Sequence, residues 1–156
     1  MKTYELEKTQ IIDRPLEEVF AFFADARNLA VLTPGWLKFE IRTKGPIQMA
    51  PGARIDYRIK LRGIPMRWQS EITVWDPPRR FVDEQRRGPY RSWVHTHAFE
   101  AIDPGRTRVR DHVRYSVPGG AVVHRLFVAP DIERIFSFRA QKLEEIFRRG
   151  GGRSDP

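Results

Sequence analysis

Two histidines spaced two residues apart, His95 and His97, are the residues best suited to chemistry in this chain. Side chains alternate between the two faces of a β-strand, so both imidazoles are predicted to share one face with Trp93 and Phe99. An imidazole donates, accepts or moves a proton near neutral pH. A wall of aromatic side chains with a few polar groups is typical of a pocket for a hydrophobic small molecule.

Carboxylates on the neighbouring strands are predicted to reach the same region. Asp83 and Gln85 share a face of the preceding strand, and Asp111 lies on an inward face of the following strand. If these faces coincide, one polar cluster results. Its predicted members are Asp83, Gln85, His95, His97 and Asp111.

The residue types leave several interpretations of this cluster open. In the first interpretation, the cluster is a hydrogen-bond network in which buried polar groups satisfy one another. In the second, the same network orients the polar end of a ligand. Alternatively, His95 or His97 acts as a general acid or base, oriented by Asp111 or Asp83. Two imidazoles and a carboxylate also match the ligand types of non-haem iron.

Further aromatic residues extend the predicted pocket wall. Those on faces predicted to point inward are Tyr57, Trp68, Trp93, Phe99 and Tyr115. Ordinary core packing and the lining of a cavity both explain them, although the polar N–H and O–H groups of Trp and Tyr need partners when buried. Trp75 has the parity of Arg67 and Glu71, which predicts a place on the outer face or near the strand end.

The elements that position these residues follow from periodicity and turn signals. Residues 4–12 alternate as a strand. Asp13 is predicted to cap a first helix that has Pro15 in its first turn. A second short helix is predicted over residues 26–32, ended by Thr33-Pro34-Gly35. The strands predicted after it cover residues 37–42, 54–61, 66–74, the hairpin 81–99 with its turn at Gly88-Pro89, and 109–115.

The C-terminal part is predicted to be helical. Residues 121–128 form a short lead-in, and Pro130-Asp131 marks a new helix start or a kink. An apolar stripe then continues to Gly150, through Ile132, Ile135, Phe136, Arg139, Leu143, Ile146 and Phe147. Residues 150–156 are predicted to be a disordered tail.

This order of elements predicts one α+β domain over residues 1–149. Hairpin-length turns make the sheet antiparallel. We therefore expect a curved sheet of six or seven strands around a long C-terminal helix at about residues 131–149, with two short helices after the first strand. A length of 156 residues suits one domain.

Composition excludes several classes of protein. The chain has no cysteine, which excludes disulfides, cysteine–zinc sites and a cysteine nucleophile. No apolar run approaches the ~20 residues of a membrane span, so we expect a soluble cytoplasmic protein. No phosphate loop, dinucleotide fingerprint or nucleophile elbow is present, and we expect no cofactor. Ser70 and Ser92 lack the context of a catalytic triad, and His112 and His124 look incidental.

The net charge of +8 and the pI of about 10.3 are typical of proteins that bind an anionic partner such as a nucleic acid. However, the arginines alternate with apolar residues, as Arg54, Arg58 and Arg62 do on one strand and Arg108, Arg110 and Arg114 on another. Such alternation predicts solvated outer faces, so we expect no nucleic-acid partner. A basic module for an anionic membrane or a nucleic acid remains an alternative.

The chain resembles the SRPBCC superfamily, which has the START-like, birch-pollen-allergen-like helix-grip fold. The resemblance covers residues 1 to about 149 and rests on the helix start at 13–20, Pro34 before Trp36, and the run DEQ…GPY…W…H…H…F within 81–99. It is strongest with bacterial proteins labelled cyclase/dehydrase-like. Members bind lipids, sterols, polyketides or other apolar ligands under the long helix, and some are aromatase/cyclases. No catalytic set is shared, so the fold implies ligand binding and not a reaction.

Together these observations predict that the chain binds a hydrophobic small molecule in an internal cavity between sheet and helix. The alternative is a polyketide cyclase/dehydratase-type enzyme that uses His95 or His97, with Asp111 as a further catalytic candidate. The metal interpretation ranks last, and we expect no metal.

Overall fold

The computed structural model describes residues 2–152, with side chains as far as residue 148. Across these residues, seven strands form one antiparallel sheet in the order β1-β7-β6-β5-β4-β3-β2. The strands are β1 (Tyr4–Ile12), β2 (Glu40–Ile41), β3 (Arg54–Leu61), β4 (Ile64–Asp76), β5 (Arg80–Arg87), β6 (Ser92–Asp103) and β7 (Arg106–Ser116). The predicted helix-grip fold is confirmed.

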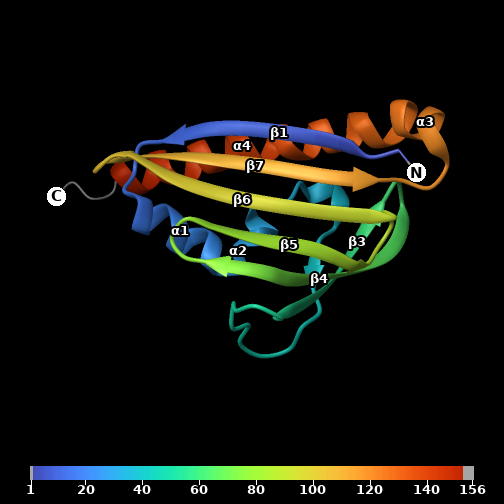
Figure 1. Ribbon diagram of the computed structural model, residues 1–156, viewed down its shortest axis with the longest axis horizontal. Coiled ribbons are helices and arrows are strands. Elements are labelled where there is room, and N and C mark those ends of the chain that lie inside the picture. The colour runs from blue at the N-terminus through green and yellow to red at the C-terminus, as the bar shows by residue number, and fades with distance from the viewer. Residues whose placement is uncertain (1, 153–156) are drawn as a thin grey trace.

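The helices lie on one side of the curved sheet (Figure 1). They are α1 (Leu16–Ala24), α2 (Asn28–Val31), the 3₁₀ helix η1 (Gly35–Leu37), α3 (Gly120–Val123), the π-helical segment η2 (His124–Val128) and α4 (Ala129–Gly152). The long helix α4 runs along the sheet, with α1 near its C-terminal end and α3 at the other end. None of the helices within residues 2–152 combines the length and the apolar character that crossing a bilayer requires.

The core forms between the inner face of the sheet and the helices. Phe20 and Phe23 of α1 pack in one buried cluster with Phe99 of β6 and with Leu143 and Phe147 of α4. The apolar stripe predicted for the C-terminal helix is therefore the face that α4 buries. Burial of a large apolar side chain contributes roughly 1.5–3 kcal/mol, so this stripe fixes the rotation of α4 and decides which of its residues face the sheet.

The register of β5, β6 and β7 brings the predicted polar residues onto one inner face. Asp83 of β5 lies opposite His95 of β6, and His97 lies opposite Asp111 of β7. The alternating burial of β6 and β7 confirms the predicted inward faces. On the outer face, the arginines are exposed as predicted, and several pair with glutamates across the strands, as Arg110 does with Glu7. The prediction is wrong for Arg62, because β3 ends at Leu61: Arg62 lies in the β3–β4 turn and pairs with the buried Asp131 of α4.

Two predictions for the segment between residues 13 and 42 are wrong. Asp13 does not cap α1: the helix begins at Leu16, its N-cap is Pro15, and no side chain caps it. The strand predicted over residues 37–42 is reduced to Glu40–Ile41. The Pro34-Gly35 pair favours a turn, which becomes η1, and Lys38 then takes a left-handed conformation with φ 49° that interrupts an extended chain.

Of the two places predicted for Trp75, the structure confirms the strand end, one residue before Asp76 closes β4, and not the outer face. The pairing of β4 with β5 has a register shift between Ile72 and Val74, and an extra residue in a strand reverses the parity of everything after it. The Trp75 ring therefore turns inward, 5.4 Å from the ring centroids of both Phe20 and Phe81.

The lead-in predicted at residues 121–128 exists as α3 and η2, and it runs directly into α4. Pro130 is the second residue of α4. Because proline has no N–H and its ring clashes with the carbonyl four residues earlier, an α-helical turn at this position is costly. The wider π-turn of η2 lies immediately before it. The predicted disordered tail at 150–156 is wrong for its first three residues, because α4 continues to Gly152. Residues 153–156 lie outside the described residues, so their disorder stays a prediction.

Candidate functional site

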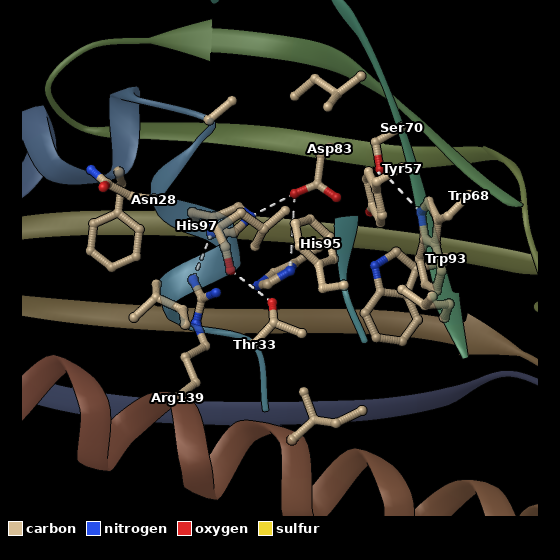
Figure 2. A pocket seen from close by; sticks show the side chains of 18 of the residues that line it. Asn28, Thr33, Tyr57, Trp68, Ser70, Asp83, Trp93, His95, His97 and Arg139 are labelled. Atoms are coloured by element: carbon tan, nitrogen blue, oxygen red, sulfur yellow. Dashed lines mark hydrogen bonds and ion pairs between the residues drawn. The ribbon is translucent and has the colours of Figure 1, made fainter. Parts of the chain in front are cut away.

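A cavity of about 170 Å³ lies between the inner face of the sheet, the α1–α2 segment and α4. Most of its lining is apolar. One wall is aromatic: the rings of Tyr57 and Trp68 stack with centroids 5.8 Å apart, and Trp93 meets Trp68 edge-on at 5.4 Å. Figure 2 shows these rings on one side of the cavity and the polar residues Asp83, His95, His97 and Arg139 together on the other.

The two histidines bind two carboxylates in a crossed arrangement. The Nε2 atom of His95 lies 2.8 Å from Asp111 Oδ1, and the Nε2 atom of His97 lies 2.6 Å from Asp83 Oδ2. Each partner comes from a different neighbouring strand and is diagonal to its histidine in the ladder. The imidazole rings stack with centroids 3.7 Å apart. The predicted hydrogen bonds from both histidines to Asp111 and Asp83 are confirmed.

Arg139 of α4 completes this cluster from the opposite side. Its Nη2 atom lies 3.3 Å from Asp111 Oδ1, to which it donates, and 3.3 Å from His97 Nδ1. A guanidinium N–H can only donate, so His97 Nδ1 accepts and carries no proton. His97 is therefore the neutral tautomer whose Nε2–H donates to Asp83.

The electrostatics agree with this assignment. Burial lowers the pKa of His97 to about 4, assisted by the charges of His95 and Arg139 and only partly opposed by Asp83. Burial alone raises the pKa of Asp83, but the hydrogen bond from His97 and the nearby positive charges outweigh it, so the pKa is lowered. Burial likewise acts to raise the pKa of Asp111, but the Arg139 charge and the His95 hydrogen bond outweigh it and hold that pKa well below its usual range.

Two nitrogen atoms of the cluster keep hydrogen-bonding capacity. His95 Nδ1 lies 4.0 Å from Asp83 Oδ2, beyond hydrogen-bond distance, and His95 lines the cavity. Arg139 Nε is buried and has no hydrogen-bond partner among the described residues. Buried polar groups are normally paired, so the cluster has room for a polar atom of a ligand.

A second, smaller polar group centres on Ser70 of β4. The Trp68 indole N–H donates to Ser70 Oγ at 3.1 Å, and the Tyr57 hydroxyl lies 2.9 Å from the same oxygen. Burial is the main cause that raises the pKa of Tyr57, and the charge of Asp83 adds to it. Tyr57 therefore stays a neutral phenol that can donate, and the polar ends of both aromatic rings are satisfied within the wall.

The structure does not bring all predicted site residues to the cavity. Tyr57, Trp68, Trp93, Asp83, His95 and His97 line it, whereas Asp111 lies behind His95. Gln85 instead clamps the β5–β6 turn: its Nε2 donates to Tyr90 O, and its Oε1 accepts from Tyr90 N–H. Phe99 packs in the core with α1. Tyr115 belongs to a different cluster, where its hydroxyl lies 2.8 Å from His124 Nε2.

Sequence reasoning missed two residues of the site. Arg139 was recognised only as part of the helical stripe, although a single arginine within an otherwise apolar stripe is the signal that identifies a buried charge. Ser70 was considered only as a catalytic serine. Its inward parity between Trp68 and Ile72 was the available signal.

Asp83, His95 and His97 place three possible metal ligands within 4.8 Å of one another. However, both nitrogens of His97 are engaged, Nε2 with Asp83 and Nδ1 with Arg139. A metal ion has to displace a proton there and to share the space with a guanidinium. We therefore expect purified protein to contain less than stoichiometric metal by elemental analysis. A stoichiometric metal that is lost in His95→Ala would contradict this prediction.

Comparisons with known proteins agree with the fold. The chain is similar over its length to Zhui aromatase/cyclase from Streptomyces sp. R1128, with 17% identity, 95% of each chain covered and a TM-score of 0.74. It is also similar to TTHA0849 from Thermus thermophilus, with 21% identity, 94% and 99% covered and a TM-score of 0.68. The major latex-like protein 151 of Panax ginseng has 12% identity, 93% and 97% covered and a TM-score of 0.69.

No protein of curated function matches the sequence. The family model described as polyketide cyclase / dehydrase and lipid transport matches residues 3–148, which is nearly the whole chain. The solved structures share the helix-grip architecture at low identity and so support the fold alone. On the match of the family model, the chain belongs to the polyketide cyclase/dehydrase and lipid transport family.

Proposed function

We propose that the protein binds a compact apolar small molecule in the cavity under α4, with the polar end of that molecule at the His–Asp–Arg cluster. One observation carries this proposal: in a mostly apolar cavity, four charged or titratable lining residues, Asp83, His95, His97 and Arg139, contact one another at one place, apart from the lining residue Asp25. Binding sites for small molecules typically combine an apolar wall with a few convergent polar groups.

The size of the cavity favours a small ligand. Its volume of about 170 Å³ is close to that of an apolar cavity of roughly 150 Å³ that binds benzene in another protein. A ligand of one or two rings, or a short acyl chain, therefore fits without rearrangement. The stacked and edge-on rings of Tyr57, Trp68 and Trp93 offer both faces and edges to an aromatic ligand.

The open nitrogen of His95 predicts which ligands bind best. We expect 2-naphthol to bind more tightly than naphthalene, because its hydroxyl can pair with His95 Nδ1. His95→Phe should weaken 2-naphthol about tenfold, or about 1.4 kcal/mol, a typical value for one hydrogen bond. The same variant should change naphthalene binding less than about threefold. Equilibrium dialysis measures both.

His112→Phe is the matched control, because His112 lies on the outer face and bonds to Glu5. It should leave both affinities unchanged. If neither probe nor a short-chain fatty acid binds below millimolar concentration, the binding proposal fails. If both probes bind and His95→Phe affects them equally, the cavity binds ligands but the cluster does not orient them.

One observation supports a second function, general acid–base catalysis by His95. The Nε2 of His95 is held by a buried carboxylate at 2.8 Å, while Nδ1 has no hydrogen-bond partner among the described residues and His95 lines the cavity. An imidazole oriented in this way is suited to proton transfer in a cyclisation or a dehydration. Turnover separates the two functions: a short poly-β-ketone thioester should be converted by the native protein and spared by His95→Gln if this second function holds.

A further inference from the structure

The segment between the sheet and α4 exposes apolar side chains that its position in the fold does not explain. Within α3 and η2, Val122 is 59% exposed, Leu126 55% and Phe127 45%. Val122 and Leu126 are four residues apart, so they lie on the same side of the helical segment. The stripe of α4, by contrast, is buried against the sheet. A helical segment that turns apolar residues to solvent is a candidate interaction surface.

A second segment extends this surface. Ile64, at the start of β4, is 59% exposed, and it lies two residues after Arg62 in the β3–β4 turn. The Arg62 guanidinium sits 4.8 Å from the centroid of the Phe127 ring, and Nη2 donates to Phe127 O at 3.4 Å. We call Ile64, Val122, Leu126 and Phe127 the end patch. It lies at the end of the molecule marked by α3 in Figure 1.

The surroundings of the end patch carry excess positive charge. Arg62 and Arg125 belong to the same segments, and the Lys2 ammonium lies 5.3 Å from the ring of Tyr4, which stacks on His124 at 3.5 Å. Among the described residues, the acid paired with these cations is Asp131, which is buried against Arg62. On the outer sheet, by contrast, several arginines pair with glutamates, as Arg54 does with Glu71, although Arg58 lies opposite Arg67.

The end patch also adjoins the cavity. Leu61 and Ile135 both line the cavity. Leu61 precedes Arg62, and Ile135 is one helical turn after Asp131. The ion pair of Arg62 with Asp131, at 3.0 Å, therefore joins the β3–β4 turn to the start of α4 beside these lining residues.

We propose that the end patch docks on an anionic lipid bilayer, with Val122, Leu126, Phe127 and Ile64 inserted at the interface and Arg62, Arg125 and Lys2 facing the headgroups. A standard protein interface uses about 20–30 residues a side, far more than two short segments provide. Interfacial binding instead scales with the apolar area inserted, and each basic residue near an anionic surface strengthens it about fivefold, or about 1 kcal/mol. The docking does not depend on the ligand that occupies the cavity.

Vesicle co-sedimentation tests the proposal with the full chain. Vesicles of phosphatidylcholine with 30% phosphatidylglycerol are compared with pure phosphatidylcholine in 100 mM salt. We expect binding to the anionic vesicles and at least tenfold weaker binding to the neutral ones. Val122→Gln/Leu126→Gln should lower the partition coefficient at least tenfold, since two buried apolar side chains are lost. Arg125→Gln should lower it about fivefold on anionic vesicles only.

Ile11→Gln is the matched control. Ile11 is 52% exposed on β1, but it lies near the end of that strand away from α3. This variant, and Arg108→Gln on the outer sheet, should bind vesicles within about twofold of the native protein. No binding to anionic vesicles, or unchanged binding by the double variant, would overturn the proposal. So would a concentration-dependent dimer in sedimentation velocity that the double variant abolishes, because the occupant would then be a second copy. None of these results bears on 2-naphthol binding, which tests the cavity separately.

Discussion

Arg139→Met is expected to lower the free energy of unfolding by about 3–5 kcal/mol at pH 7, the usual cost of removing one partner from a buried ionic group. Arg139 is 6% exposed, and it is the guanidinium that lies against the buried Asp111 and His97. Methionine preserves much of the apolar volume against Phe23 and Phe136 but leaves Asp111 and Asp83 with less positive charge. Urea denaturation followed by circular dichroism measures the loss.

The loss should shrink as the pH is lowered toward 4. Without the Arg139 charge, the pKa of Asp111 in the folded protein rises, because the largest of the effects that oppose burial is lost. The folded variant then takes up a proton that restores neutrality. Arg148→Met is the control on the same helix: Arg148 is exposed and pairs only with Glu144 among the described residues, so a change within about 0.5 kcal/mol is expected.

The pair Arg139→Met with Asp111→Asn separates net charge from packing. If the cost of Arg139→Met is the stranded carboxylate, the double variant should be more stable than Arg139→Met alone, because no uncompensated charge remains on that side. If both variants lose the same free energy, the cost arises from lost packing of the guanidinium between the two phenylalanine rings. That result would contradict the charge argument.

Strand alternation explains why so much of the site followed from the sequence. The period of two is a property of the extended backbone, so the inward direction of His95, His97, Asp83 and Asp111 needs only the correct strand boundaries. The hairpin at Gly88-Pro89 and the turn at Asp103-Pro104-Gly105 set those boundaries. The pairing of the residues followed because antiparallel neighbours bring diagonal side chains within reach.

The wrong predictions of the outer face for Trp75 and of the cavity for Gln85, and the failure to predict Arg139, depend on features that the alternation of side chains along a strand does not determine. A register shift in β4 reversed the direction of Trp75, and a one-residue irregularity has no sequence signal of its own. Gln85 has the correct parity, but it lies close enough to the turn that the Tyr90 backbone binds its amide. Arg139 belongs to the site only because α4 packs against the sheet at one rotation and depth. The packing of the apolar stripe of α4 against the sheet and α1 sets this rotation and depth.

The same limits apply to function. The sequence contains the aromatic wall and the titratable residues, but the volume of the cavity depends on how closely α4 and the α1–α2 segment approach the sheet. Family membership and the residues of the cluster are therefore consistent with both binding and catalysis. Turnover separates the two. The proton positions within the cluster, on which both proposals depend, affect a property of the protein that is measurable without any ligand.

That property is the dependence of stability on pH between 7 and 4. The pKa of His97 is about 4 in the folded protein, against 6.5 for an ordinary histidine. Between these values the unfolded chain binds a proton that the folded protein does not, so stability rises with pH in this window. The contribution of neutral His97 to the free energy of unfolding is fully present above pH 6.5 and is lost as the pH falls toward 4. The difference between the two pKa values corresponds to about 3 kcal/mol of stability.

His97→Gln tests whether this slope belongs to His97. Glutamine keeps an N–H donor for Asp83 but cannot be protonated, so the variant should lose most of the slope between pH 6.5 and 4.5 even if it is less stable throughout. His112→Gln removes a half-buried imidazole on the outer face and should keep the native slope. If His97→Gln retains the full slope, His97 is not the neutral donor that its contacts with Asp83 and Arg139 require. The proton would then have to lie elsewhere in the cluster, and the assignment of His95 Nδ1 as the nitrogen open to a ligand would have to be abandoned with it.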